Sequence, residues 1–260
     1  MNYSFQYSDQ SGQVSWHGVV FPEGHDFTGF LETDVADRLG DRAAETDFEN
    51  HLRGLAITGF ARENLEAVLS ADIPEEREWA IGESIAEAFL GGKCNITWPW
   101  NMERDKRVTT AILPGADLVG FEDGEKGIRL ALGEVKTSSQ ELCPPTVMSG
   151  RSGGMMHQID NLANNLSVTC KLLKWLWPRC KNGEYEDSFN AAVCHFVENG
   201  NKGIALFGVL VRDTSPNEGD LSERARDFAE KLTVPTTCQL FAVYLPCAIS
   251  ELPARLGVSS

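Results

Sequence analysis

The chain has 260 residues, of which 42% are hydrophobic, so it is long enough to bury a sizeable core in one large domain or two small ones. Its formal net charge of −15 repels a phosphate backbone, which counts against a protein that binds nucleic acid unaided. No apolar run could span a bilayer and no basic and apolar leader opens the chain, so we expect a cytoplasmic protein with no membrane contact. The seven cysteines form no Cys-x-x-Cys pair, so we expect no zinc site. If a chain with this charge acts on nucleic acid, a protein partner is expected to supply the positive surface that binds it.

Residues 1–73 have the patterns of an accessory α+β region packed on a core. An apolar run over 14–21 is typical of a strand. Helical spacing with many acids recurs over 27–39, 43–55 and 62–70.

A clear helix is predicted over 75–90, with Pro74 at its start and the glycine pair 91–92 at its end. At 100° per residue, Glu83 lies at the rim of the apolar arc, whereas Glu87 points further toward water. A carboxylate at the rim of a buried face is unusual, and a solvated flanking carboxylate is the ordinary interpretation.

The most informative stretch of the chain is 114–136. Two apolar runs flank a turn over 122–127 that contains Asp-Gly, which adopts positive φ at little cost. Because side chains two positions apart share one face of a strand, Glu134 and Lys136 end the apolar face of the second run. Folding the hairpin about its middle brings Asp117 within a residue or two of Glu134. The sequence therefore predicts two carboxylates and a lysine at one end of a β-hairpin.

This combination of side chains suits a hard divalent cation. Mg²⁺ takes oxygen ligands, typically one or two carboxylates with substrate phosphate and water, and Mn²⁺ accepts the same ligands. A neighbouring lysine can steady the attacking water or the phosphate charge. The alternative is a surface hairpin with a solvated Glu and Lys, because Glu-x-Lys triplets are common.

Pro114-Gly115-Ala116-Asp117, followed by Glu134-Val135-Lys136, resembles the PD-(D/E)xK phosphodiesterase superfamily of restriction and repair nucleases. Residues 75–175 carry the resemblance, which rests on a short and degenerate pattern, and here two residues separate the proline from the aspartate. The layout is also similar to nuclease subunits of bacterial antiphage systems, such as the Hachiman nuclease.

The resemblance implies that Asp117 and Glu134 bind the metal, with Glu83 as a third candidate ligand, and that Lys136 orients the attacking water. The implied activity is Mg²⁺-dependent hydrolysis of DNA phosphodiester bonds, in a defence complex with a helicase or ATPase partner. A catalytically inactive nuclease-fold module that binds a partner protein or a nucleic-acid end is the competing hypothesis. A structural α/β protein with a chance Glu-x-Lys triplet is a third.

A loop without periodicity follows over 137–154, and loops of this length are usually functional or disordered. It ends at a predicted helix N-terminus, which favours anions, so Arg151 is a candidate phosphate ligand and Ser152 a candidate cap. A flexible connector is an equally good interpretation. The longest helix is predicted over 155–177, and its apolar stripe, which includes Leu166 and Trp177, is interpreted as core. Gln158 near its start is a polar candidate facing the site.

The C-terminal third reads as strand, strand, helix and strand, over 191–197, 204–211, 221–232 and 239–245. The strand–helix–strand unit needs a crossover, so part of the sheet is expected to be parallel. The layout of 74–260 agrees with the fold class that the resemblance implies, an α/β, restriction-endonuclease-like αβββαβ core with a mixed sheet. The chain has no Walker A motif for ATP hydrolysis.

Overall fold

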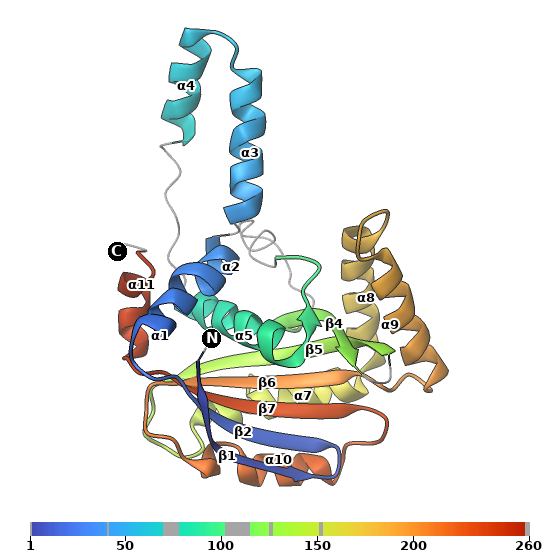
Figure 1. Cartoon of the computed structure of the whole chain (residues 1–260). Coiled ribbons are helices and arrows are strands. Elements are labelled where there is room, and N and C mark those ends of the chain that lie inside the picture. Colours follow the sequence, from blue (N-terminus) through green and yellow to red (C-terminus); the bar gives the residue numbers. More distant parts are fainter. Residues whose placement is uncertain are drawn as a thin grey trace.

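The computed structural model describes residues 2–40, 42–69, 78–101, 115–124, 127–150 and 153–257. Its strands are β1 (Ser4–Ser11), β2 (Val14–Val20), β3 (Ile96–Thr97), β4 (Leu118–Gly124), β5 (Gly127–Ser138), β6 (Ala205–Arg212) and β7 (Thr237–Tyr244). Within the described ranges they form a seven-stranded sheet in the order β1-β2-β7-β6-β5-β4-β3, flanked by helices (Figure 1).

The sheet is mixed, as predicted. Neighbouring strands are parallel from β2 through β7 and β6 to β5, whereas β1 on β2, β4 on β5 and β3 on β4 are antiparallel. The N-terminal strands β1 and β2 therefore share one sheet with the rest of the chain. The predicted boundary between residues 73 and 74 falls outside the described residues. Strand β1 is not predicted from the sequence, because its residues are mostly polar and exposed, and only the short aromatic alternation of Tyr3, Phe5 and Tyr7 indicates it.

The helices of the first half are α1 (His25–Phe30), which continues through a π-helical turn (Leu31–Val35) into α2 (Ala36–Gly40), then α3 (Arg42–Leu55), α4 (Gly59–Leu69) and α5 (Glu78–Cys94). Those of the second half are α7 (Met155–Asn164), α8 (Leu166–Cys180), α9 (Glu186–Glu198), α10 (Ser222–Ala229) and α11 (Leu252–Arg255). Short 3₁₀ turns occupy Thr146–Met148, Glu218–Asp220 and Ile249–Glu251. No helix in the described part of the chain is long and apolar enough to cross a bilayer.

Two apolar layers form on the two faces of the sheet, because successive strand side chains alternate. On one face, Ala131 and Val135 of β5 pack with α5 and with α1 (Figure 1). On the other, Leu130 and Leu132 of β5 pack with α7, α8, α9 and α10. We call these the α5 face and the α7 face.

Helix α5 differs from its prediction at the end that is described. It continues through the glycine pair 91–92 and ends at Cys94, where Asn95 has a positive φ of 52°. A left-handed residue directly after the last helical residue is a common helix stop. A Cβ atom at Gly91 would lie 3.4 Å from the Trp98 indole nitrogen and 3.6 Å from the Ile96 carbonyl oxygen, which are ordinary contact distances, so the glycine does not break the helix and the next segment packs directly against it.

The single helix predicted over 155–177 is wrong, because the chain breaks at Asn165. This residue has extended backbone angles (φ −102°, ψ 95°), and its side chain accepts a hydrogen bond from the Ser167 N–H at 3.1 Å, which caps α8. The break rotates the later residues out of the predicted apolar stripe. Leu166 and Trp177, predicted as core, are therefore 54% and 37% exposed.

The strand predicted over 191–197 is also wrong, because this segment lies within α9. The buried residues are Phe189, Ala192 and Phe196, which follow the spacing of a helix that packs on one side. The later predictions of a strand, a helix and a strand are confirmed by β6, α10 and β7.

Candidate active site on the β4–β5 hairpin

The predicted proximity of Asp117 and Glu134 is confirmed by the hairpin register. Leu118 pairs with Gly133, so the next position places Asp117 opposite Glu134. The Asp117 N–H donates to the Gly133 carbonyl at 3.1 Å, and the Val135 N–H donates to Asp117 Oδ2 at 2.9 Å. Both acids lie on the α7 face, because Asp117 is in phase with Val119 and Glu134 with Leu132.

Glu134 is buried, with only 1% of its surface exposed. It lies in β5, which has β4 on one side and β6 on the other. Lys136 Nζ donates to Glu134 Oε1 at 2.5 Å, and the Lys136 side chain is 22% exposed. The alternative of a solvated surface hairpin is therefore wrong for Glu134. An acid with this burial requires a partner, and its nearest cation lies two residues along the same strand.

The environment of Glu134 favours its protonated form. Burial and the neighbouring negative charge of Asp117 raise the pKa of Glu134 to about 8, although the Lys136 ammonium opposes the shift. A second positive charge near both carboxylates would relieve their repulsion. A pair of this kind has the electrostatic properties of a cation site.

Gln158 lies on the same face as the acid pair. On β6, the residue beside Glu134 is Gly208, and a Cβ atom there would lie 2.7 Å from Ile159 Cδ1 and 3.0 Å from Met155 Sδ. Helix α7 therefore crosses the sheet at the level of Glu134, and the half-buried Gln158 lies on this helix directly before Ile159. Gln158 Oε1 is buried and has no hydrogen-bond partner among the described residues. It is thus an oxygen acceptor in need of a donor.

Glu83 approaches from the other side of the sheet. Its helix, α5, packs on the α5 face, and a Cβ atom at Gly82 would lie 2.3 Å from Thr137 Oγ1. Glu83 is half-buried, and every other residue from 80 to 90 is buried. The prediction that Glu87 points toward water is wrong, because Glu87 is 7% exposed and accepts a hydrogen bond from Arg38 at 3.0 Å.

The structure therefore brings together Asp117, Glu134 and Lys136, with Gln158 on the same face, and does not add Glu83 to them. Within the described ranges, no group of three or more His, Cys, Asp or Glu residues could hold a metal ion. Two facing carboxylates still fit Mg²⁺ or Mn²⁺, which use one or two protein carboxylates and complete their shell with water and phosphate. The candidate phosphate ligands Arg151 and Ser152 lie outside the described residues.

No family model, curated protein or solved structure matches this chain. The resemblance to the PD-(D/E)xK superfamily therefore stays an interpretation of residues 114–117 and 134–136.

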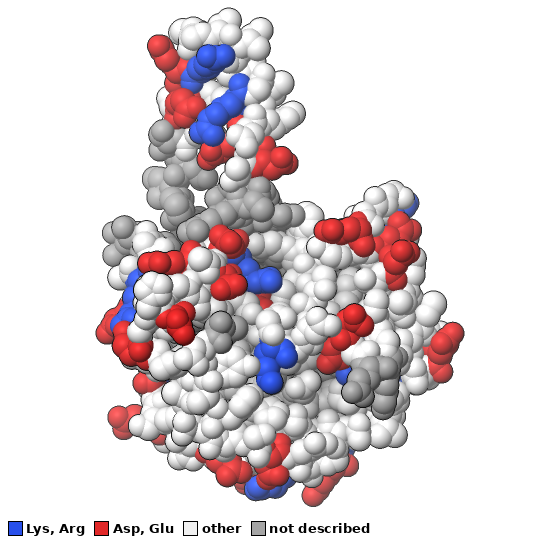
Figure 2. Space-filling model, in the orientation of Figure 1, with Lys and Arg blue, Asp and Glu red and all other residues white. Residues whose placement is uncertain are grey.

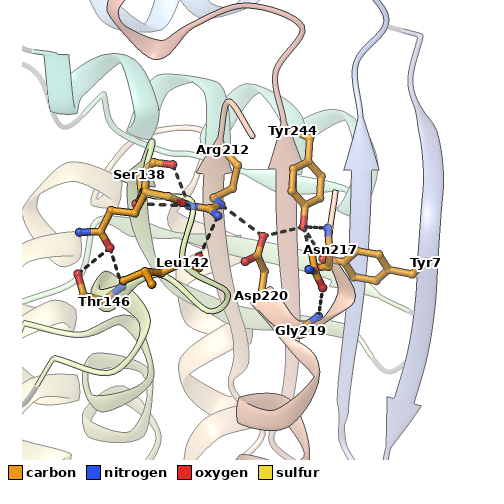
Figure 3. Close-up of polar contacts among 10 residues, drawn as sticks. Tyr7, Ser138, Leu142, Thr146, Arg212, Asn217, Gly219, Asp220 and Tyr244 are labelled. Atoms are coloured by element: carbon orange, nitrogen blue, oxygen red, sulfur yellow. Dashed lines mark hydrogen bonds and ion pairs between the residues drawn. The ribbon is translucent and has the colours of Figure 1, made fainter. Parts of the chain in front are cut away.

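A buried arginine that no pattern in the sequence indicates anchors the segment leaving β5 (Figure 3). Arg212 is 2% exposed, and its Nη1 donates to the carbonyls of Ser138 at 3.1 Å and Gln140 at 2.6 Å. Its Nη2 donates to the Leu142 carbonyl at 3.2 Å, and its Nε donates to Asp220 Oδ2 at 3.3 Å. One guanidinium thus fixes the backbone that follows Lys136.

The other side of this anchor is a tyrosine network. The Tyr244 hydroxyl donates to Asp220 Oδ2 at 2.9 Å and lies 2.9 Å from the Tyr7 hydroxyl (Figure 3). Asp220 is fully buried, so Arg212 and Tyr244 supply donors that its carboxylate needs. Ser138, Arg212 and Tyr244 end three neighbouring strands, which couples the start of the 139–150 segment to the middle of the sheet.

Proposed function

We propose that this protein is a Mg²⁺- or Mn²⁺-dependent nuclease that hydrolyses DNA phosphodiester bonds on a restriction-endonuclease-like αβββαβ core. The observation that carries the proposal is the position of Asp117 opposite a buried Glu134, whose carboxylate holds Lys136 at 2.5 Å. This arrangement supplies two carboxylates and one amine on a rigid hairpin, as metal-assisted phosphodiester hydrolysis requires.

Each residue has a separate role in the proposal. Asp117 and Glu134 hold the cation, and the Val135 N–H fixes the Asp117 carboxylate through its Oδ2. The bound cation would stabilise the charge that develops on the phosphate and lower the pKa of the attacking water. Lys136 orients that water, and the uncompensated Gln158 oxygen can accept one of its hydrogen bonds.

We further propose that the nuclease works in the cytoplasm as one subunit of an antiphage defence complex with a helicase or ATPase. The net charge of −15 supports this proposal, because an acidic chain repels the DNA backbone and needs a partner that supplies the positively charged DNA-binding surface. On the face drawn in Figure 2, the lysines and arginines of the described residues are scattered among acids rather than gathered in one surface.

The test is Mg²⁺-dependent cleavage of plasmid and single-stranded DNA by the wild-type chain and by Glu134→Gln, which keeps the side-chain shape. The matched control is Asp123→Asn, which removes an exposed carboxylate from the same hairpin. We expect Glu134→Gln to lose cleavage by at least about a hundredfold, as removal of a metal ligand or a charge-stabilising group does. Equal cleavage by Glu134→Gln and the wild type would show that the assignment is wrong.

One observation favours a second candidate, the catalytically inactive nuclease-fold module. The Lys136 ammonium already donates a hydrogen bond to Glu134, and the raised pKa of Glu134 favours its protonated form at neutral pH. The two side chains can therefore stay together as a purely structural contact without a metal ion. Such a module would bind a partner or a nucleic-acid end without a cation. It would show no thermal shift with Mg²⁺ or Mn²⁺, whereas the nuclease would show one that Glu134→Gln abolishes.

A further inference from the structure

Helices α3 and α4 form a hairpin that projects from the body of the protein (Figure 1). We call residues 42–69 the arm. Its two helices meet along a seam where Leu52, Ala61 and Leu65 are partly buried and Ala56 is 7% exposed. A pair of helices this small can bury little apolar surface by itself.

One flank of the arm is ionic. Arg53 of α3 donates to Glu66 of α4 at 3.1 Å and to Glu49 of its own helix at 2.7 Å. The contact with Glu66 bridges the two helices, and the contact with Glu49 holds Arg53 on the surface of α3. Figure 2 shows charged side chains on the arm.

The opposite flank of the arm is apolar. Phe48 and Leu55 lie seven residues apart, on one line along α3, and this line is about 150° from Arg53 around the helix. On α4, Val68 and Phe60 lie on the side away from Glu66 by the same geometry. The exposed fractions of the large apolar side chains here and at the tip of the arm are 58% for Phe48, 65% for Leu55, 81% for Ile57, 78% for Phe60 and 66% for Val68.

The size of this surface matches what a weak but specific dimer needs. At about 100 Å² per side chain, the four residues of the flank and Ile57 at the tip together offer about 500 Å² on one copy and about 1,000 Å² on two, close to the lower limit for a specific interface. A two-fold axis would place the apolar flank of one arm on the same flank of another and make four packed helices, with both ionic flanks in water.

The distribution of charge also favours arm-to-arm contact over body-to-body contact. Residues 42–69 have three arginines and five acids, so the arm carries −2 and the rest of the chain −13. The arm is about 20 Å long at 1.5 Å per helical residue. Contact through the arms would keep the two acidic bodies further apart than the screening length of about 8 Å at physiological salt.

We propose that two copies of this chain associate through the apolar flanks of their α3–α4 arms. The inference does not depend on the proposed nuclease activity. Each interface residue occurs twice in such a dimer, so a substitution on the flank acts twice.

The experiment is sedimentation velocity on the full chain over a wide concentration range, with two variants that each add one carboxylate to α3. Leu55→Glu places it on the apolar flank, and Asn50→Glu places it on an exposed position of the other side. We expect a concentration-dependent dimer for the wild type and for Asn50→Glu. For Leu55→Glu we expect at least about a hundredfold weaker association, because two charges would be desolvated in the interface.

Hydrogen exchange of the wild-type chain provides a second measurement that needs no variant. Protection of the amides in α3 and α4 should rise with concentration, while protection in β5 and β6 should not. If the wild-type chain stays monomeric at its highest soluble concentration, the proposal is overturned. The apolar flank would then be a binding surface for a different protein. Equal association of Leu55→Glu and Asn50→Glu overturns it as well, provided that both variants keep the wild-type circular dichroism spectrum.

Discussion

The Val135 N–H donates to Asp117 Oδ2 at 2.9 Å, so the strand that carries Glu134 also holds the carboxylate that faces it. The two acids are therefore fixed by backbone pairing rather than by flexible side chains. Because of this backbone pairing, the two carboxylates stay close together although Lys136 donates to Glu134. The folded hairpin therefore holds two carboxylates that repel each other, and a bound proton or cation relieves this repulsion.

Glu134 should make the stability of the protein fall with rising pH. Its pKa is raised from an ordinary value of 4.5 to about 8, so the folded chain keeps a proton that the unfolded chain releases over this range. The contribution is fully present below about pH 4.5 and is lost as the pH rises to about 8. The free energy of unfolding of Glu134→Gln, measured with denaturant and compared with that of the wild type, should rise by at least about 1 kcal/mol between pH 4.5 and pH 8. This amount is equivalent to about one pKa unit.

The control for this titration is Asp123→Asn, which neutralises an exposed acid of the same hairpin. Its stability difference from the wild type should change little with pH. A difference between Glu134→Gln and the wild type that stays constant from pH 4.5 to pH 8 would contradict the raised pKa of Glu134.

Metal binding should release a proton from Glu134. Because a cation and a proton compete for this carboxylate, Mg²⁺ or Mn²⁺ should bind more tightly at about pH 8.5 than at about pH 6.5. Calorimetry in two buffers with different ionisation enthalpies measures the number of protons released. We expect between about half a proton and one proton per cation near pH 7, since Glu134 is then mostly protonated. Binding without proton release would place the cation elsewhere.

Arg212 should be one of the most sensitive positions in the described chain. Arg212→Met leaves the Asp220 carboxylate buried without its cation and removes the donor from three backbone carbonyls, which should cost about 3–5 kcal/mol. Arg226→Met is the matched control. Arg226 is 56% exposed at its side chain and reaches Asp9 at 3.5 Å, so its loss should cost less than about 1 kcal/mol.

Arg212→Met should also loosen the segment after Lys136. Amides from 138 to 142 should exchange faster in this variant than in Arg226→Met. If both variants unfold at the same denaturant concentration, Arg212 does not anchor the segment.

The features predicted correctly from the sequence are the ones set by local patterns. Alternation along β5 and the position of the hairpin's middle predict the register that brings Asp117 to Glu134, because both signals lie within one hairpin. The prediction that Asp-Gly forms the turn is wrong, because Asp123 and Gly124 pair within β4 and the positive φ lies at Gly127. The break at Asn165 is also local, but its capping hydrogen bond interrupts an apolar pattern that by itself predicts a continuous helix. Arg212 contacts carbonyls more than 70 residues earlier in the chain, and no spacing within the sequence indicates such a contact.

Gly82 should be required for α5 to pack against β5. In most helices a glycine-to-alanine change stabilises by up to about 1 kcal/mol, but here the new Cβ would lie 2.3 Å from Thr137 Oγ1. The short, branched Thr137 side chain has little freedom to move away, so we expect Gly82→Ala to destabilise by about 1–3 kcal/mol in denaturant unfolding.

Gly29→Ala is the control, because Gly29 lies in α1 and a Cβ atom there would have nothing within 4 Å, so this change should be neutral or stabilising. Thr137→Ala removes the clash, so the double variant Gly82→Ala/Thr137→Ala should recover most of the stability lost by Gly82→Ala relative to Thr137→Ala alone. A Gly82→Ala loss that persists in full on the Thr137→Ala background would show that α5 and β5 do not meet at these residues.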